Sequence, residues 1–253
     1  MVNNFHTHTY RCHHAIGSDE EYVKCAIQAG IKQLGFSDHT PWHYNSHFQP
    51  TMRMSESQLD EYIESILTLK EKYKNQIDIL IGLECEYFEK YMPWLKKTLE
   101  EKPIDYIILG NHYYKTDEKH IHFGSPVNEK LLKSYVDHCI DAIDTGLYSY
   151  IAHPDLVCFD SCSSIYKKEM SRLCQYAKKH DIPLEFNLLG FISGQNYPDE
   201  NFWKIASQYH NKAIIGFDAH TPDSLFNMDV YNKAYRYLSS LDVELIDTIK
   251  KFK

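Results

Sequence analysis

The chain has 253 residues, of which 43% are hydrophobic and 25% charged, as in folded globular proteins and unlike disordered or fibrous ones. Its 27 basic and 35 acidic residues give a net charge of -8, and no dense basic block suggests a nucleic-acid partner. No apolar run approaches the roughly 20 residues of a membrane span, and no signal peptide is visible. We therefore expect a cytoplasmic protein that contacts neither nucleic acid nor membrane.

Short apolar runs typical of buried strands alternate with segments of helical periodicity along the chain. Capping boxes open two of the predicted helices, Ser18 with Glu21 and Ser55 with Gln58, and Gly30 ends the first of them. No linker or repeat interrupts the pattern, which predicts a single domain over residues 1–253. The predicted order is strand 3–6, helix 18–30, strand 32–37, helix 55–74, strands 77–84 and 106–110, helix 128–146, strand 150–153, helix 164–180, strand 183–187, helix 199–210, strand 213–217 and helix 223–241.

This alternation of strands and helices predicts an α/β fold with a parallel sheet. Either a doubly wound sheet or a closed barrel satisfies it. The ten glycines form neither a G-x-G-x-x-G motif nor a P-loop, so a nucleotide-binding doubly wound sheet is disfavoured and a barrel is favoured.

Polar residues that bind metals or take part in catalysis follow nearly every predicted strand, at intervals that match one strand-plus-helix unit. In a parallel α/β barrel the carboxyl ends of all strands meet at one face, so these residues are expected to converge there. In chain order they are His6, His8, Asp38, His39, Glu84, His112, His153, Asn187, Asp218 and His220.

The mixture of imidazoles and carboxylates suits zinc, manganese or iron better than calcium or magnesium. Taken singly, each motif has a structural explanation. The pair His120 and His122 lies in a polar loop and is interpreted as solvated or hydrogen-bonded, and Cys12 and Cys85 are interpreted as small buried fillers. The regular placement of the whole set favours a metal centre. No G-x-S-x-G or H-E-x-x-H motif supports another type of catalysis.

As an ordered set, these motifs resemble the polymerase and histidinol phosphatase (PHP) metallohydrolases, and within them the monomeric bacterial histidinol-phosphate phosphatases. The resemblance spans residues 6–220. It implies a distorted TIM-like barrel of seven β/α units that binds three divalent metal ions, zinc first, with manganese or iron as alternatives. The matching segments are Phe-His6-Thr-His8, Cys-His13-His14-Ala, Phe-Ser-Asp38-His39, Gly-Leu-Glu84, Leu-Gly-Asn-His112, Ile-Ala-His153-Pro-Asp, Leu-Glu-Phe-Asn187 and Gly-Phe-Asp218-Ala-His220.

The resemblance also implies which residues bind each ion. His14 is preferred to His13 because the family places this ligand six residues after the second histidine of the H-x-H pair. All nine positions carry a suitable residue, which argues against a relative that has lost its activity. The first ion takes His6, His8, Glu84 and Asp218; the second takes Glu84, His112 and His153; the third takes His14, His39 and His220.

A cluster of this kind favours hydrolysis of a phosphoester by a hydroxide shared between metal ions. Glu84 and Asp218 would organise the reaction as ligands, Asp38 would support neighbouring ligands, and His13 or His43 could deliver a proton or could equally be a solvated loop residue. Phosphate also favours fixed positive charge. The expected substrate-binding residues are Arg53, Arg11, Lys115, Asn187 and His43.

The favoured substrate is L-histidinol phosphate, an intermediate of histidine biosynthesis, hydrolysed by a chain that acts as a monomer. Residues 155–159 and the positions Phe191 and Ile192 lack the positive charge found in many members of the family, which leaves another small phosphoester or a nucleotide as an alternative. A metal-binding module without turnover is the third interpretation.

Overall fold

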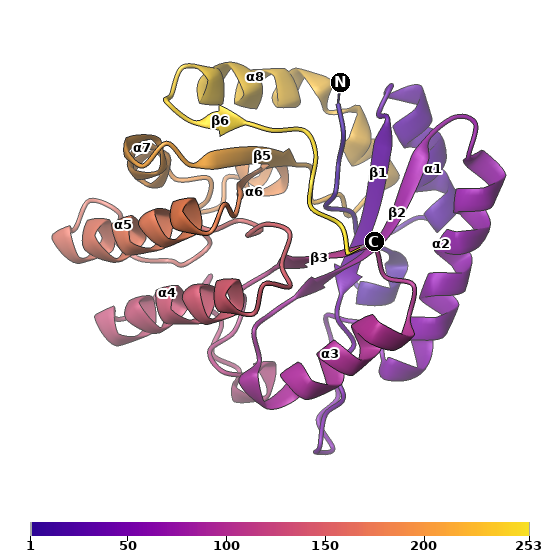
Figure 1. The fold of residues 1–253 in the computed structure, drawn as a ribbon, viewed down its shortest axis with the longest axis horizontal. Coiled ribbons are helices and arrows are strands. Elements are labelled where there is room, and N and C mark those ends of the chain that lie inside the picture. The colour runs from indigo at the N-terminus through magenta and orange to yellow at the C-terminus, as the bar shows by residue number, and fades with distance from the viewer. Residues whose placement is uncertain (1, 253) are drawn as a thin grey trace. The chain divides into compact units, whose positions relative to one another are not determined.

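Residues 2–252 are described by a computed structural model, shown in Figure 1. They form two compact units, the first made of residues 2–108, 217–228 and 247–252, the second of 109–216 and 229–246. Each unit combines parallel strands with helices, which confirms the α/β class. The single domain expected over residues 1–253 stays a prediction.

The sheet of the first unit has the strand order β1-β2-β3, with β1 at Gln33–His39, β2 at Asp78–Cys85 and β3 at Tyr106–Leu109. Strands β1 and β2 are parallel, and their register runs from Gln33 opposite Asp78 to His39 opposite Glu84. The predicted ligands His39 and Glu84 therefore lie side by side at the carboxyl ends of two adjacent strands.

The N-terminal segment of the first unit is held by isolated parallel bridges, from Asn4 to Leu34 of β1 and from Thr7 to Ala219. Tyr106 adds a second attachment, because its hydroxyl donates to the Phe5 carbonyl oxygen at 2.8 Å. The Tyr106 ring lies so close to Gly82 that a Cβ there would be 2.4 Å from Tyr106 Cζ, so only glycine fits. These contacts place His6 and His8, which flank Thr7, beside the strand ends.

Helices α1 (Asp19–Gln28) and α2 (Leu59–Tyr73) lie beside β1 and β2 in Figure 1. The capping box of Ser18 and Glu21 opens α1 as predicted. Helix α3 was not predicted; it carries Pro93 in its first turn, where a missing N–H breaks no helical hydrogen bond. The helical elements of this unit are η1 (Tyr10–Cys12), α1 (Asp19–Gln28), η2 (Glu56–Gln58), α2 (Leu59–Tyr73), η3 (Glu89–Tyr91), α3 (Met92–Glu101) and η5 (Pro222–Phe226).

The second unit contains a sheet of order β4-β5-β6, in which Asn187 is the register partner of Gly216. Ile151 joins Leu109 and Leu184 through isolated parallel bridges. Its elements are η4 (Asp117–Lys119), α4 (Glu129–Asp144), α5 (Ser164–Lys179), β4 (Leu184–Asn187), α6 (Leu188–Ser193), α7 (Glu200–Gln208), β5 (Lys212–Gly216), α8 (Met228–Ser239) and β6 (Glu244–Leu245).

Several predicted boundaries were wrong. The strand expected at 150–153 is reduced to the bridge at Ile151, because His153 has a positive φ of 30° and Pro154 has no N–H to extend a ladder. The helix expected at 223–241 is split into η5 and α8 at Asn227, whose ψ of 44° leaves the helical region. Helix α6 and strand β6 were not predicted.

Strand pairing within residues 2–252 comprises two three-stranded sheets and isolated bridges, without a closed seven-unit barrel. The distorted barrel therefore stays a prediction. No helix in this part of the chain has both the length and the hydropathy needed to cross a membrane.

Candidate metal centre

Seven of the nine predicted metal ligands belong to the first unit, where they come from four separate segments of the chain. Most are buried, whereas His14 is exposed and His220 is partly exposed. They are His6, His8 and His14 in the N-terminal segment, His39 at the end of β1, Glu84 near the end of β2, and Asp218 and His220 after β5.

Two carboxylates, Glu84 and Asp218, lie against the same two imidazoles. His6 Nε2 is 3.3 Å from Asp218 Oδ1 and 3.7 Å from Glu84 Oε2. His8 Nε2 is 3.2 Å from Asp218 Oδ1 and 3.5 Å from Glu84 Oε2. Two ligand atoms that each lie about 2.1 Å from one ion are separated by roughly 3.0–3.5 Å, so these distances fit a shared cation.

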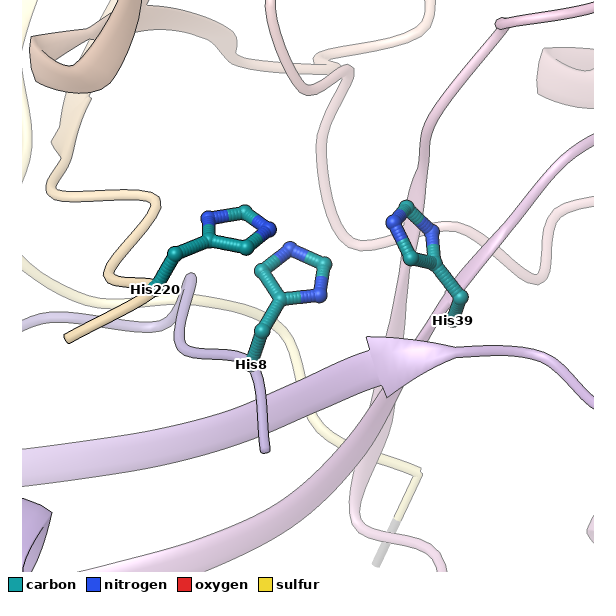
Figure 2. A group of neighbouring side chains, drawn as sticks. All are labelled: His8, His39 and His220. Atoms are coloured by element: carbon teal, nitrogen blue, oxygen red, sulfur yellow. The ribbon is translucent and has the colours of Figure 1, made fainter. Parts of the chain in front are cut away.

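The imidazoles of this cluster also contact one another. Figure 2 shows the rings of His8, His39 and His220 turned toward a common region from three separate segments. The His8 and His220 rings are stacked with centroids 4.1 Å apart, and the His8 and His39 rings are 4.5 Å apart. His14 stacks on His220 at 4.7 Å. His39 Nδ1 lies 3.0 Å from Glu84 Oε2, which joins this group to the carboxylates.

Hydrogen bonds show which nitrogen of two of these rings is available to a metal. His220 Nδ1 lies 3.0 Å from the Asp218 carbonyl oxygen, and His14 Nδ1 lies 2.8 Å from the Cys12 carbonyl oxygen. Because a carbonyl oxygen only accepts, each Nδ1 must donate, which leaves the lone pair of a neutral ring on Nε2. His220 Nε2 is buried and has no hydrogen-bond partner among the described residues, so this nitrogen fits a metal ligand.

Charge in the cluster is set by these contacts. Burial acts to raise the pKa of Asp218, but the neighbouring His6 and His8 outweigh it and hold that pKa well below its usual value. Burial acts to lower the pKa of His8, but hydrogen bonds with Asp218 and Asp38 raise it overall. The His220 pKa falls to about 3, first through burial and then through the positive charge of His8. The cluster thus provides carboxylates beside a neutral imidazole, as a metal site requires.

Asp38 contacts residues of two segments that carry predicted ligands, and its role behind those ligands stays a prediction. Its Oδ1 accepts a hydrogen bond from the His39 backbone N–H at 2.8 Å, and its Oδ2 accepts from the Thr9 backbone N–H at 3.2 Å and from the Thr9 hydroxyl. The same Oδ1 is 3.5 Å from His8 Nδ1. Asp38 therefore links the segments that carry His8 and His39.

The remaining two predicted ligands, His112 and His153, belong to the second unit. Their ring centroids are 5.0 Å apart. The His153 backbone N–H donates to Glu185 Oε2 at 3.0 Å, and the Asn187 side-chain amide donates to the same oxygen at 2.9 Å. Glu185 was not predicted as a functional residue, although a glutamate inside an apolar strand was a visible signal.

Both arginines predicted to bind phosphate are buried and engaged with carboxylates. Arg53 donates to both oxygens of Glu86, at 2.7 and 3.1 Å, and to the Thr40 carbonyl oxygen at 3.0 Å. Arg11 donates to Asp19 at 3.0 Å and to Glu61 at 2.6 and 3.0 Å. The structure thus gives each guanidinium a structural partner, and the phosphate-binding role of both stays a prediction.

The other predicted substrate residues are placed as follows. Asn187 Oδ1 accepts from the Gly190 N–H at 2.9 Å and caps helix α6. His13 is exposed, with a left-handed φ of 69° at the end of η1. His43 is exposed and lies 2.6 Å from Glu56. Lys115 is exposed too, with its Nζ over the Tyr114 ring.

His122 was interpreted as a solvated or hydrogen-bonded loop residue, and its ring is stacked on that of the predicted ligand His112, with centroids 6.2 Å apart. His122 Nδ1 accepts from the Gly124 backbone N–H at 3.0 Å, so its Nε2 carries the proton in a neutral ring. The hydrogen bond with Gly124 agrees with the interpretation of this pair as solvated or hydrogen-bonded, whereas the contact with His112 was not predicted. A return of the chain through the Tyr113–His122 bridge, which no local pattern reveals, brings the two histidines together.

Comparison with known proteins shows the family. Residues 4–188 match the PHP domain. The chain is 26% identical over 281 residues to a protein of Schizosaccharomyces pombe named "Probable histidinol-phosphatase", covering 99% of this chain and 90% of that one. It is also 26% identical over 251 residues to a histidinol-phosphatase of Bacillus subtilis, covering 85% and 92% of the two chains. The chain belongs to the PHP domain family and is related to the histidinol-phosphatases.

A solved structure agrees with this fold. The histidinol phosphate phosphatase of Lactococcus lactis, in complex with zinc, L-histidinol and phosphate, superposes with a TM-score of 0.74 at 19% identity. The match covers 100% of this chain and 99% of that one. At this identity the likeness establishes a common α/β fold of the PHP type.

Proposed function

We propose that this protein is a metal-dependent phosphomonoesterase that hydrolyses L-histidinol phosphate to L-histidinol and phosphate. The coarser part of the proposal, a phosphatase of the PHP family, is supported by the matched domain and the related histidinol-phosphatases. The finer part, the substrate, is supported by the names of those relatives and by the ligands of the Lactococcus lactis structure. The proposal includes a distorted seven-unit barrel and a single chain acting in the cytoplasm.

The observation that carries the proposal is the buried contact of His6 and His8 with Glu84 and Asp218. We assign these four residues to the first metal ion, Glu84 with His112 and His153 to the second, and His14, His39 and His220 to the third. Zinc is the first choice for such imidazole-rich sites, with manganese or iron as alternatives.

Divalent ions, when bound, make a water molecule a nucleophile at neutral pH and neutralise the charge that develops on the phosphoryl oxygens. The chain's own residues hold the ligands in place: Asp38 fixes the His39 backbone, and Glu185 fixes the His153 backbone. His13 at the exposed end of η1 is the proposed proton donor to the leaving alkoxide.

The test is a phosphatase assay on protein of measured metal content, with L-histidinol phosphate beside a panel of small phosphomonoesters and nucleotides. We expect hydrolysis of L-histidinol phosphate, its loss after treatment with a strong chelator, and its return with zinc or manganese. Turnover that survives removal of all bound metal would contradict the mechanism. Preference for another phosphoester would contradict only the substrate.

A further inference from the structure

Cys12 lies inside the predicted third metal site, although the sequence suggested only a small buried filler. Its side chain is fully buried. The Cys12 Sγ, one ring nitrogen of His14 and one of His220 all lie within 4.8 Å of one another. A nitrogen and a sulfur bound to one tetrahedral zinc ion are roughly 3.5 Å apart, so this spacing fits a shared ion.

The local backbone explains the arrangement. Cys12 ends the short helix η1, and His13 adopts a left-handed φ of 69°, which reverses the chain. His14 Nδ1 then donates to the Cys12 carbonyl oxygen at 2.8 Å, so that the thiol and the imidazole Nε2 belong to one tight turn. His220 adds a buried Nε2 without a hydrogen-bond partner in the described part of the chain.

A second cysteine near the ligands provides a contrast. Cys85 is also fully buried and directly follows the predicted ligand Glu84. The Thr40 hydroxyl donates to its Sγ at 2.7 Å. The Cys12 Sγ lies instead among the ligand atoms of His14 and His220. The two thiols thus have similar exposure and different neighbours.

We infer that the Cys12 thiolate joins His14 and His220 as a ligand of the third metal ion, and that this sulfur makes the site prefer zinc, cadmium or cobalt to manganese. The inference rests on the proposed function, because it adds a ligand to a metal site that the proposal already contains. Formation of the sulfur–metal bond releases the thiol proton to solvent and requires no oxidant or reductant.

Cobalt reports this bond directly. Metal-free protein is titrated with Co²⁺, the bound ions are counted by elemental analysis, and the near-ultraviolet absorption is followed for thiolate-to-cobalt charge transfer. We expect an intense band in the wild type, its loss in Cys12→Ser, and its retention in the matched control Cys85→Ser. Cobalt bound in the expected number without such a band would overturn the inference and leave the proposed function intact. Failure to bind cobalt at all would count against both.

Metal selectivity gives a second readout. In competition between Zn²⁺ and Mn²⁺, Cys12→Ser is expected to reduce the preference of one site for zinc by about tenfold or more. Circular dichroism of the metal-free variants checks that they are folded. If Cys12→Ser is unfolded, the wild-type cobalt spectrum decides by itself, because that measurement needs no substitution. A preference unchanged in folded Cys12→Ser would overturn the inference.

Discussion

Two buried aspartates, one in each unit, have opposite protonation behaviour. Asp218 in the first unit is 5% exposed and Asp155 in the second is 1% exposed, so burial acts on both in the same direction. Histidines surround Asp218 and hold its pKa well below the usual value. For Asp155, burial raises the pKa to about 8, and the charges of Asp199 and Glu185 act in the same direction. Neighbouring groups, rather than burial, decide where a carboxylate stays charged.

The comparison explains why the buried cluster of the first unit favours the binding of cations. The pKa values of Asp38 and Asp218 are lowered by neighbouring histidines, which overcome burial, so a metal ion finds negative charge already in place. In the second unit the imidazoles of His112 and His153 lie beside each other, and the Glu185 carboxylate accepts a hydrogen bond from the His153 backbone N–H. We therefore expect changes in the first unit to remove metal ions, and changes in the second to act through ligand position or charge.

The largest effect is expected from Glu84→Gln. The substitution keeps the shape of the side chain but removes the negative charge that contacts His6, His8 and His39. We expect kcat for a phosphomonoester to fall roughly 10³-fold or more, with a loss of bound metal. The measurements are steady-state kinetics and elemental analysis. Glu71→Gln, an exposed side chain on α2, is the control; equal metal content and kcat in both variants would refute the ligand role.

The second largest effect is expected from Arg53→Met, and it concerns stability. The substitution leaves the Glu86 carboxylate buried without the guanidinium that donates to both of its oxygens. Breaking a buried ion pair from one side costs about 3–5 kcal/mol. The free energy of unfolding, measured by denaturant titration, should fall by this amount and recover partly in the double variant Arg53→Met with Glu86→Gln. If Arg53 also binds phosphate, the folded double variant will show a KM raised several-fold with unchanged metal content. An unaltered KM would reject the phosphate role.

Asp155→Asn tests the second half of the comparison. Because the folded pKa of Asp155 is raised to about 8, the folded state favours the protonated form. This contribution to stability is fully present below about pH 4 and is lost as pH rises toward 8. The wild type should therefore lose a few kcal/mol of unfolding free energy relative to Asp155→Asn between those limits.

Unfolding at several pH values measures this difference, and equal pH profiles for the two proteins would show that Asp155 is ionised in the folded state. The amide side chain introduced by Asp155→Asn would keep an acceptor oxygen for the Asp199 N–H, which is 2.6 Å from Asp155 Oδ2 in the wild type. Asp144→Asn serves as the control, since Asp144 lies at the end of α4 with a tyrosine hydroxyl as its partner.

Contacts between side chains that are distant in the sequence mark the limit of what the sequence could predict. Periodicity and caps are local, so the helix opened by Ser18 was predicted, and the strands expected at 32–37 and 77–84 are present as β1 (Gln33–His39) and β2 (Asp78–Cys85). The parallel register then brings His39 and Glu84 together. Pairing between distant side chains depends on how loops return, so the carboxylate partners of Arg11 and Arg53 and the stacking of His122 on His112 could not be predicted.

The smallest effect is expected from substitutions of Glu185. They also show whether Glu185 acts by holding His153 in position or through its negative charge. Its Oε2 accepts from the His153 backbone N–H, and its side chain passes directly over Gly216, where a Cβ would lie 1.8 Å from Glu185 Oε1. Removal of a group that orients a metal ligand reduces metal affinity about 10–100-fold. We expect this loss for Glu185→Ala at one site, measured by competition with a chelating dye.

Two further variants distinguish a role of Glu185 in positioning His153 from a role of its negative charge. Glu185→Gln keeps an acceptor oxygen for His153 and should retain most of the affinity, so a loss equal to that of Glu185→Ala would show that charge, not position, matters. Gly216→Ala leaves Glu185 chemically intact but displaces it, because Oε1 and the new methyl group cannot occupy the same space. If position governs the site, Gly216→Ala will weaken metal binding in the manner of Glu185→Ala; full affinity in a folded Gly216→Ala protein would mean that His153 is held without Glu185.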